Sequence, residues 1–123
     1  MKYDGIIASV VERTGLFKGD AVALIRATLA TLAERMSGDE ARDLAAHLPG
    51  PLQDALLPTE EQAEAFGFDE FVNRVAQRWR RDPTATKSAV EAVLATLREA
   101  VKPGEFDDVL SHLLGDVDRL AAQ

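Results

Sequence analysis

The sequence predicts an all-α protein, an orthogonal helical bundle of two similar halves that share one core. Three observations support this fold class. Apolar residues recur at helical spacing along most of the chain, no segment shows the alternation of a half-buried strand, and the chain matches itself at an offset of 65 residues, the separation of Tyr3 from Phe68. With 123 residues, the chain is long enough for a single domain over residues 1–123 with its own core.

The internal repeat sets the predicted organisation of that domain. Residues 3–57 match residues 68–122, and residues 58–67 form the linker between the two copies. In one stretch, residues 29–32 and residues 94–97 are both Leu-Ala-Thr-Leu. One copy of about 55 residues would be marginal as an independent fold. We therefore predict that the two copies, with three to four helices each, depend on one another for a common core.

Each half begins with an amphipathic helix and continues with a longer one. The first helix ends before Gly15, and Asp82 with Pro83 predicts the start of the long helix in the second half. Apolar residues at helical spacing place one side of each helix against a core. These residues are Ile6, Ile7, Val10, Val11, Val22, Ile25, Leu29, Leu32 and Met36 in the first half, and Phe71, Val72, Val75, Val90, Leu94, Leu97 and Val101 in the second.

A third, shorter helix follows in each half. In the first half, Ser37 and Glu40 form a predicted capping box at its start. In the second half, Pro103 stands in the first turn, where proline is tolerated. Short helical pieces at residues 52–56 and 117–121 complete the two halves.

Composition excludes several classes of function. The net charge of −7 is not that of a duplex nucleic-acid binder, and the lack of cysteine excludes disulfides, thiol catalysis and cysteine-ligated metals. No run approaches the roughly 18 apolar residues of a membrane span. The sequence also lacks phosphate-loop and nucleophile-elbow motifs. We expect a cytoplasmic protein that is not an enzyme, uses no cofactor and contacts neither nucleic acid nor membrane.

Four segments in combination resemble one known family. They are Tyr3-Asp4, Phe68-Asp69-Glu70-Phe71, residues 103–109 with the sequence Pro-Gly-Glu-Phe-Asp-Asp-Val, and the Leu48-Pro49 step. Together they resemble the bacterial family catalogued as domain of unknown function 2267, and the resemblance covers nearly the whole chain. It implies a small, all-helical, usually cytoplasmic bacterial protein with an internal duplication. It implies no activity.

A repeated pair of aspartate and histidine is the candidate metal site. Asp43 and His47, and likewise Asp108 and His112, are four residues apart and share a helical face. If the fold brought both histidines together, these four residues could bind Zn²⁺ or another transition metal. A histidine near the end of a helix also suits the helix dipole without any ligand. A metal or small-ligand site between the halves is therefore the alternative function, and a structural role is favoured for these residues.

A basic segment around the single tryptophan is the candidate partner-binding site. Arg74, Arg78, Trp79 and Arg81 stand out in an acidic chain, and arginine beside tryptophan suits an acidic partner. Acidic neighbours would neutralise part of this charge, and a solvated helix face is the simpler interpretation. The function that we predict is a non-enzymatic protein-interaction or scaffolding module. It would bind a protein partner, or a second copy of itself, through these four residues.

Overall fold

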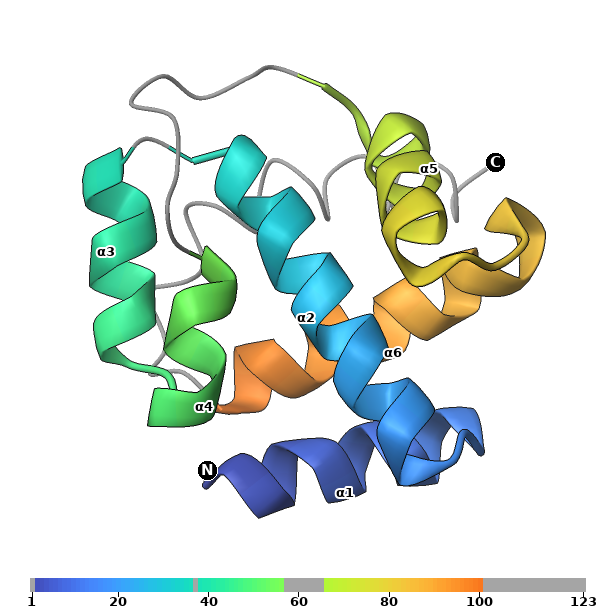
Figure 1. The fold of residues 1–123 in the computed structure, drawn as a ribbon, viewed down its shortest axis with the longest axis horizontal. Coiled ribbons are helices and arrows are strands. Elements are labelled where there is room, and N and C mark those ends of the chain that lie inside the picture. Colours follow the sequence, from blue (N-terminus) through green and yellow to red (C-terminus); the bar gives the residue numbers. More distant parts are fainter. Residues whose placement is uncertain (1, 37, 57–65, 101–123) are drawn as a thin grey trace.

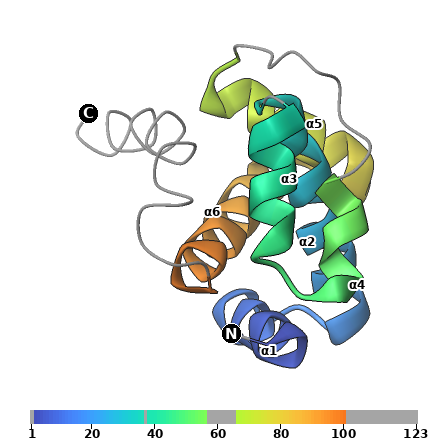
Figure 2. The same ribbon diagram turned by 90° about the vertical axis from the view of Figure 1, so that its left-hand side faces the viewer.

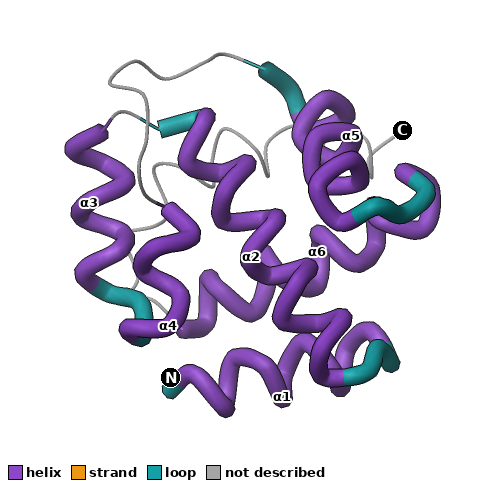
Figure 3. Tube along the Cα trace, viewed as in Figure 1, coloured by secondary structure: helices purple, strands orange, loops and turns teal. Residues whose placement is uncertain are grey.

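The computed structural model describes residues 2–36, 38–56 and 66–100, and every regular element in these ranges is a helix. The elements are α1 (Tyr3–Thr14), α2 (Lys18–Glu34), α3 (Gly38–Ala46), α4 (Gly50–Gln53), the 3₁₀ helix η1 (Asp54–Leu56), α5 (Phe68–Trp79) and α6 (Pro83–Ala100) (Figure 1; Figure 3). The predicted all-α class is therefore confirmed. None of the helices described combines the length and the hydropathy that crossing a lipid bilayer requires.

Local sequence explains where these helices begin and end. α1 ends at Gly15, whose φ of 74° lies in the left-handed region that glycine tolerates best. α6 begins at Pro83 as predicted, and the Asp82 side chain accepts a hydrogen bond of 2.7 Å from the Thr84 amide. Arg80, the residue that follows α5, also has a positive φ, 62°. Arginine pays a steric cost in this conformation that glycine does not.

Helix α2 occupies the centre of the described structure. It contacts α1, α5, α6 and η1, with α3 and α4 on one side of it and α5 on the other (Figure 1). Figure 2, turned by 90°, shows α1 and α6 side by side. The most extensive helix pairings join α1 to α6 and α2 to α5. Each first helix of the predicted repeat therefore packs against the long helix of the other copy.

The buried apolar side chains form one continuous core. All six α-helices and η1 contribute to it. The predicted stripes are buried as expected, except that Val11 and Val22 are only partly buried and Val101 lies outside the described residues. Several large side chains within the core are less than 2% exposed: Phe68, Phe71, Ile6, Leu24, Ile25, Leu29, Leu32, Met36, Leu52, Leu56 and Leu94.

The element bounds follow the sequence repeat. α5 begins and ends 65 residues after α1, and α6 begins 65 residues after α2. The left-handed residues Gly15 and Arg80 are separated by the same offset. Ser37 and residues 101–123, which include Pro103 and the predicted piece at 117–121, lie outside the described residues. The complete two-half architecture, with its linker at 58–67, therefore stays a prediction.

Candidate functional site

The structure divides the basic segment of α5 between the two ends of α2. Arg74 and Arg78 lie against the C-terminal end of α2, where both form ion pairs with Glu34. Trp79 and Arg81 lie at the other end of α2 and contact Asp20. The four predicted residues thus do not form one continuous exposed patch.

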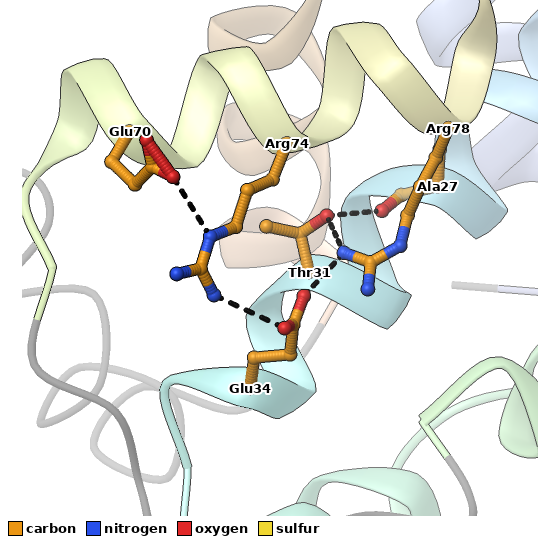
Figure 4. A network of polar contacts seen from close by, with 6 residues as sticks. All are labelled: Ala27, Thr31, Glu34, Glu70, Arg74 and Arg78. Carbon is orange, nitrogen blue, oxygen red and sulfur yellow. Dashed lines mark hydrogen bonds and ion pairs between the residues drawn. The ribbon is translucent and has the colours of Figure 1, made fainter.

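At the C-terminal end of α2, four residues form what we call the α2/α5 cluster: Thr31, Glu34, Arg74 and Arg78 (Figure 4). Arg78 Nη1 donates a hydrogen bond of 2.6 Å to Thr31 Oγ1 and forms an ion pair with Glu34 Oε1. Arg74 Nη1 donates to Glu34 Oε2 at 3.1 Å. Glu34 therefore faces two guanidinium groups, one on each carboxylate oxygen.

The α2/α5 cluster is partly shielded from solvent. The side chain of Glu34 is 29% exposed, and that of Arg74 is 26% exposed. Glu34 Oε1 is buried, and it faces the Arg78 guanidinium in a direct ion pair. Partial burial strengthens such a contact because less water screens it. The cluster therefore holds α5 against α2.

A second cluster repeats three of these four residues, one arginine, the threonine and the glutamate, and joins α1 to α6. This α1/α6 cluster consists of Arg13, Thr96 and Glu99. Arg13 Nη1 donates to Thr96 Oγ1 at 3.2 Å, and Arg13 Nη2 forms an ion pair with Glu99. Each of its residues lies 65 positions from its counterpart in the α2/α5 cluster. The repeat has therefore kept one Arg–Thr–Glu contact twice, both times between helices of different copies.

The two threonines of these clusters also share a backbone contact. Thr31 Oγ1 donates to the carbonyl oxygen of Ala27 at 2.9 Å, and Thr96 Oγ1 donates to that of Ala92 at 2.8 Å. Each hydroxyl therefore bonds back to the preceding helical turn. Because the hydroxyl proton is used in this bond, the threonine oxygen is oriented to accept a hydrogen bond from arginine.

The other end of α2 is held by Trp79 and Arg81. Trp79 Nε1 donates to the backbone oxygen of Asp20 at 3.2 Å, and Arg81 Nη2 lies 3.1 Å from Asp20 Oδ1. The Arg81 guanidinium also lies over the Trp79 ring, 4.8 Å from its centroid. α5 is therefore attached to α2 at both ends by residues of the basic segment.

An open groove runs along α2 between η1 and α5, and we call it the alanine groove. It is lined by Ala23, Arg26, Ala27, Ala30, Ala55 and Arg78 and has a volume of about 460 Å³. The three alanines on α2 are spaced four and three apart and so share one helical face. Small side chains on the floor and arginines at its edges are the main chemical features of this groove.

The two arginines of the groove are held by neighbouring elements. Arg26 donates to the Pro51 carbonyl oxygen at 2.9 Å and forms an ion pair of 3.0 Å with Asp54. The hydrogen bond from Arg26 holds the pKa of the Asp54 carboxyl below its ordinary value, so this pair stays charged at neutral pH. Arg78 is held by the α2/α5 cluster. Both cations therefore have defined positions at the groove.

The candidate metal residues are only partly within the described structure. Asp43 and His47 are exposed and lie one turn apart on α3 and just beyond it, whereas Asp108 and His112 lie outside the described residues. In the part of the chain that the structure covers, no group of three or more histidine or acidic residues could hold a metal ion. The joint metal site therefore stays a prediction.

Sequence reasoning missed the α1/α6 cluster. Arg13 is not among the predicted site residues, because a single arginine on a short amphipathic helix does not indicate a site. The repeat itself carried the signal: Arg13 and Arg78 occupy matching positions, as do Glu34 and Glu99. Charged residues retained at matching positions on helices that must share a core were the clue to these contacts.

One comparison with known proteins gives a match. The profile of a family described as "Uncharacterized conserved protein (DUF2267)" matches residues 3–120. No curated protein matches the chain.

Proposed function

The chain belongs to the DUF2267 family, whose description names no activity, and from this premise we propose a non-enzymatic protein-interaction module. It binds an acidic helical segment of a partner protein in the alanine groove. The observation that carries the proposal is the groove itself, an open hollow lined by four alanines and two positioned arginines.

The shape of the groove supports a helical occupant. Packed helices lie 8–10 Å apart, depending on the side chains at the contact, and small residues allow the closest approach. Ala23, Ala27 and Ala30 form such a surface on α2, and Ala55 extends it onto η1. A partner helix could place its larger apolar side chains over these alanines, as in other helix-in-groove complexes.

Charge supports an acidic occupant. Among the described residues, the groove lining contains two arginines and no acidic residue, whereas the chain as a whole carries a net charge of −7. This local contrast favours an acidic segment and disfavours a basic one. Arg26 and Arg78 each have a carboxylate partner at the groove edge, Asp54 and Glu34, so their positions are set before a partner arrives and less entropy is lost on binding.

The predicted contact residues have different roles in this proposal. Arg78 contacts the partner directly, and Arg26 joins it. Arg74, Trp79 and Arg81 keep α5 in place beside the groove through Glu34 and Asp20. Exposure supports this division, because the side chain of Arg78 is 39% exposed and that of Arg74 only 26%.

The same proposal includes the complete architecture. We propose that residues 3–57 and 68–122 form two similar halves of one orthogonal bundle in the cytoplasm. The paired Arg–Thr–Glu clusters and the common core of the described helices support it. So does a feature of the sequence: Arg26 and Asp54 are matched 65 residues later by Glu91 and Arg119, a pair of opposite charges with the signs exchanged.

The test uses a substitution in the floor of the groove. Ala23→Glu adds a carboxylate at an exposed position of α2, and Ala8→Glu makes the same change at an exposed position of α1 outside the groove. A set of peptides with one apolar stripe and either acidic, neutral or basic flanks would be titrated by NMR. We expect the acidic peptide to bind the wild type and Ala8→Glu with shifts along α2, and to lose at least about tenfold in affinity for Ala23→Glu.

Two results would count against the proposal. One is binding that does not depend on peptide charge, and the other is equal binding by Ala23→Glu and Ala8→Glu. Light scattering of the free protein identifies self-association, in which a second molecule of the protein would occupy the alanine groove. The wild type, Ala8→Glu and Ala23→Glu are then used to capture proteins from cell extract. The natural partner is the protein that the wild type and Ala8→Glu retain and Ala23→Glu does not.

A further inference from the structure

A second concavity lies away from the alanine groove and shares no lining residue with it. It is enclosed by the C-terminal ends of α1 and α5 and the N-terminal half of α6, and its volume is about 230 Å³. We call it the α1/α6 pocket. Its lining consists of Arg13, Thr14, Leu16, Trp79, Arg81, Ala85, Ser88 and Ala89.

The sequence repeat explains why a pocket forms between α1 and α6. Where α5 meets the start of α2, Trp79 and Arg81 close the junction through Asp20. The positions matching these three residues are Thr14, Leu16 and Ala85, all in the lining of the α1/α6 pocket. Smaller side chains without the ion pair therefore stand at the junction of α1 and α6. The pocket is a specific difference between two otherwise similar junctions.

The lining combines an apolar body with a cationic edge. Leu16, Ala85, Ala89 and the Trp79 ring supply the apolar part. Arg13 and Arg81 supply the charge, and the described lining includes no carboxylate. An anion that carries an apolar group would therefore be complementary to this pocket.

Both arginines have guanidinium N–H groups that could donate hydrogen bonds to a ligand. Arg81 has one ion pair among the described residues, from Nη2 to Asp20, and its guanidinium stacks on Trp79. Arg13 uses its two Nη atoms on Thr96 and Glu99, and no described residue accepts from its Nε. A guanidinium has five N–H groups, so a carboxylate at the pocket edge could accept from both side chains.

Volume sets the size of the ligand. A cavity of about 150 Å³ holds benzene, whereas pockets for drug-sized ligands begin at about 300 Å³. At about 230 Å³, the α1/α6 pocket fits one aromatic ring with a short polar substituent. The Trp79 ring forms part of the pocket wall, so an aromatic ring in the pocket can contact it.

We propose that the α1/α6 pocket binds a small aromatic carboxylate of one ring, of which benzoate is the simplest example. The ring lies against Trp79 and the apolar lining, and the carboxylate accepts hydrogen bonds from Arg81 and Arg13. This inference is independent of the alanine groove, and either could fail without the other.

Trp79 is the only tryptophan of the chain, so its indole N–H signal in NMR and its fluorescence come from a residue that lines this pocket. The probes are benzoate, benzyl alcohol, which keeps the ring without the charge, and acetate, which keeps the charge without the ring. We expect benzoate to shift the Trp79 signal with saturation in the millimolar range. Benzyl alcohol and acetate should each bind at least about tenfold more weakly. Equal binding of benzoate and acetate would reduce the pocket to a general anion site and overturn the proposal.

Two variants test the location of binding. Ala85→Leu fills the pocket, and Ala95→Leu makes the same change at an exposed position of α6 outside the lining. Arg81→Gln removes one cation, and Lys87→Gln removes a cation of α6 that does not line the pocket. We expect Ala85→Leu and Arg81→Gln to weaken benzoate binding at least about tenfold, with both controls unchanged. Circular dichroism confirms that each variant is folded, and unchanged benzoate binding by folded Ala85→Leu contradicts the proposal.

Discussion

The α2/α5 cluster and the α1/α6 cluster are two copies of one contact in different surroundings. In the first, Glu34 is 29% exposed and faces two arginines. In the second, Glu99 is 53% exposed and, among the described residues, faces one arginine, Arg13. The position that matches Arg74 is Ser9 in the other copy, and its hydroxyl lies 3.4 Å from Thr96 Oγ1. The partner residue types of the contact are therefore shared, but its electrostatic strength is not.

This difference distinguishes two contributions to the contact between the copies, the apolar packing and the ion pairs. In both places the first helix of one copy packs on the long helix of the other, and these are the two most extensive helix pairings of the described structure. The added charge is concentrated at the junction of α2 and α5, beside the alanine groove. We infer that packing holds the halves together and that the ion pairs adjust the stability of one junction. The predictions below test this distinction in order of expected effect.

The largest effect is expected in the core of the two long helices. Leu29 of α2 and Leu94 of α6 occupy matching positions, and both are almost fully buried. Leu29→Ala and Leu94→Ala should each lower the free energy of unfolding by about 2–5 kcal/mol, because each leaves a cavity in a common core. Urea unfolding measures both. A large loss for one variant with almost none for the other would show that the two junctions differ in packing as well as in charge.

Removal of the carboxylate charge should destabilise the protein more at the α2/α5 cluster than at the α1/α6 cluster. Glu34→Gln takes the shared anion from Arg74 and Arg78, and we expect a loss of about 1–2 kcal/mol in the free energy of unfolding. Glu99→Gln breaks one exposed pair and should lower it by less than about 1 kcal/mol. Glu12→Gln, an exposed site on α1, serves as the control. Equal losses from Glu34→Gln and Glu99→Gln would contradict the inferred difference in electrostatic strength.

The ends of the two first helices permit a subtler comparison. Gly15 and Arg80 occupy matching positions with positive φ, and a Cβ at Gly15 would meet no other atom within 4 Å. Gly15→Ala should therefore destabilise the protein by about 1 kcal/mol through backbone strain alone. Arg80→Gly should stabilise it by about 0.5 kcal/mol, since relief of strain is partly offset by the greater freedom of glycine when unfolded. Thermal unfolding of both variants should shift the midpoint in opposite directions.

The smallest effect is expected at the edge of the alanine groove. Its hydrogen bond with Arg26 lowers the pKa of Asp54 in the folded protein below the ordinary value of 3.8, so the unfolded chain binds a proton at Asp54 more readily. The pair therefore stabilises the fold at neutral pH, and this contribution is lost as the pH falls through the lowered pKa. Asp54→Asn should be slightly less stable than wild type at neutral pH and equal to it in acid. A stability difference that grows on acidification would contradict this sign.

Much of the fold could be predicted from the sequence because helical periodicity and the repeat are strong local signals. Gly15 marked the end of α1, and Asp82 with Pro83 marked the start of α6, as the structure shows. The pairing of α1 with α6 could not be predicted in the same way. An apolar stripe shows that a helix is buried but does not show which helix covers it.

The candidate site was harder to predict for the same reason. The charges of Arg74 and Arg78 were evident, but their partner Glu34 lies about 40 residues earlier in sequence and meets them only through packing. The alanine groove has no sequence signal beyond three small residues on one face of α2. The α1/α6 pocket arises from small side chains at positions where the other copy has Trp79 and Arg81, a difference that acquires meaning only with the fold known.

The central claim is that the two copies support a single core, and Val10→Ala tests it most directly. Val10 is fully buried on α1 in the first copy, whereas Trp79, the only tryptophan, reports from α5 in the second. Urea unfolding of this variant should give one transition, with Trp79 fluorescence and far-ultraviolet circular dichroism shifted together to lower urea. A fluorescence transition that stays at its wild-type midpoint while the circular dichroism shifts would contradict the claim, because the two copies would then unfold separately.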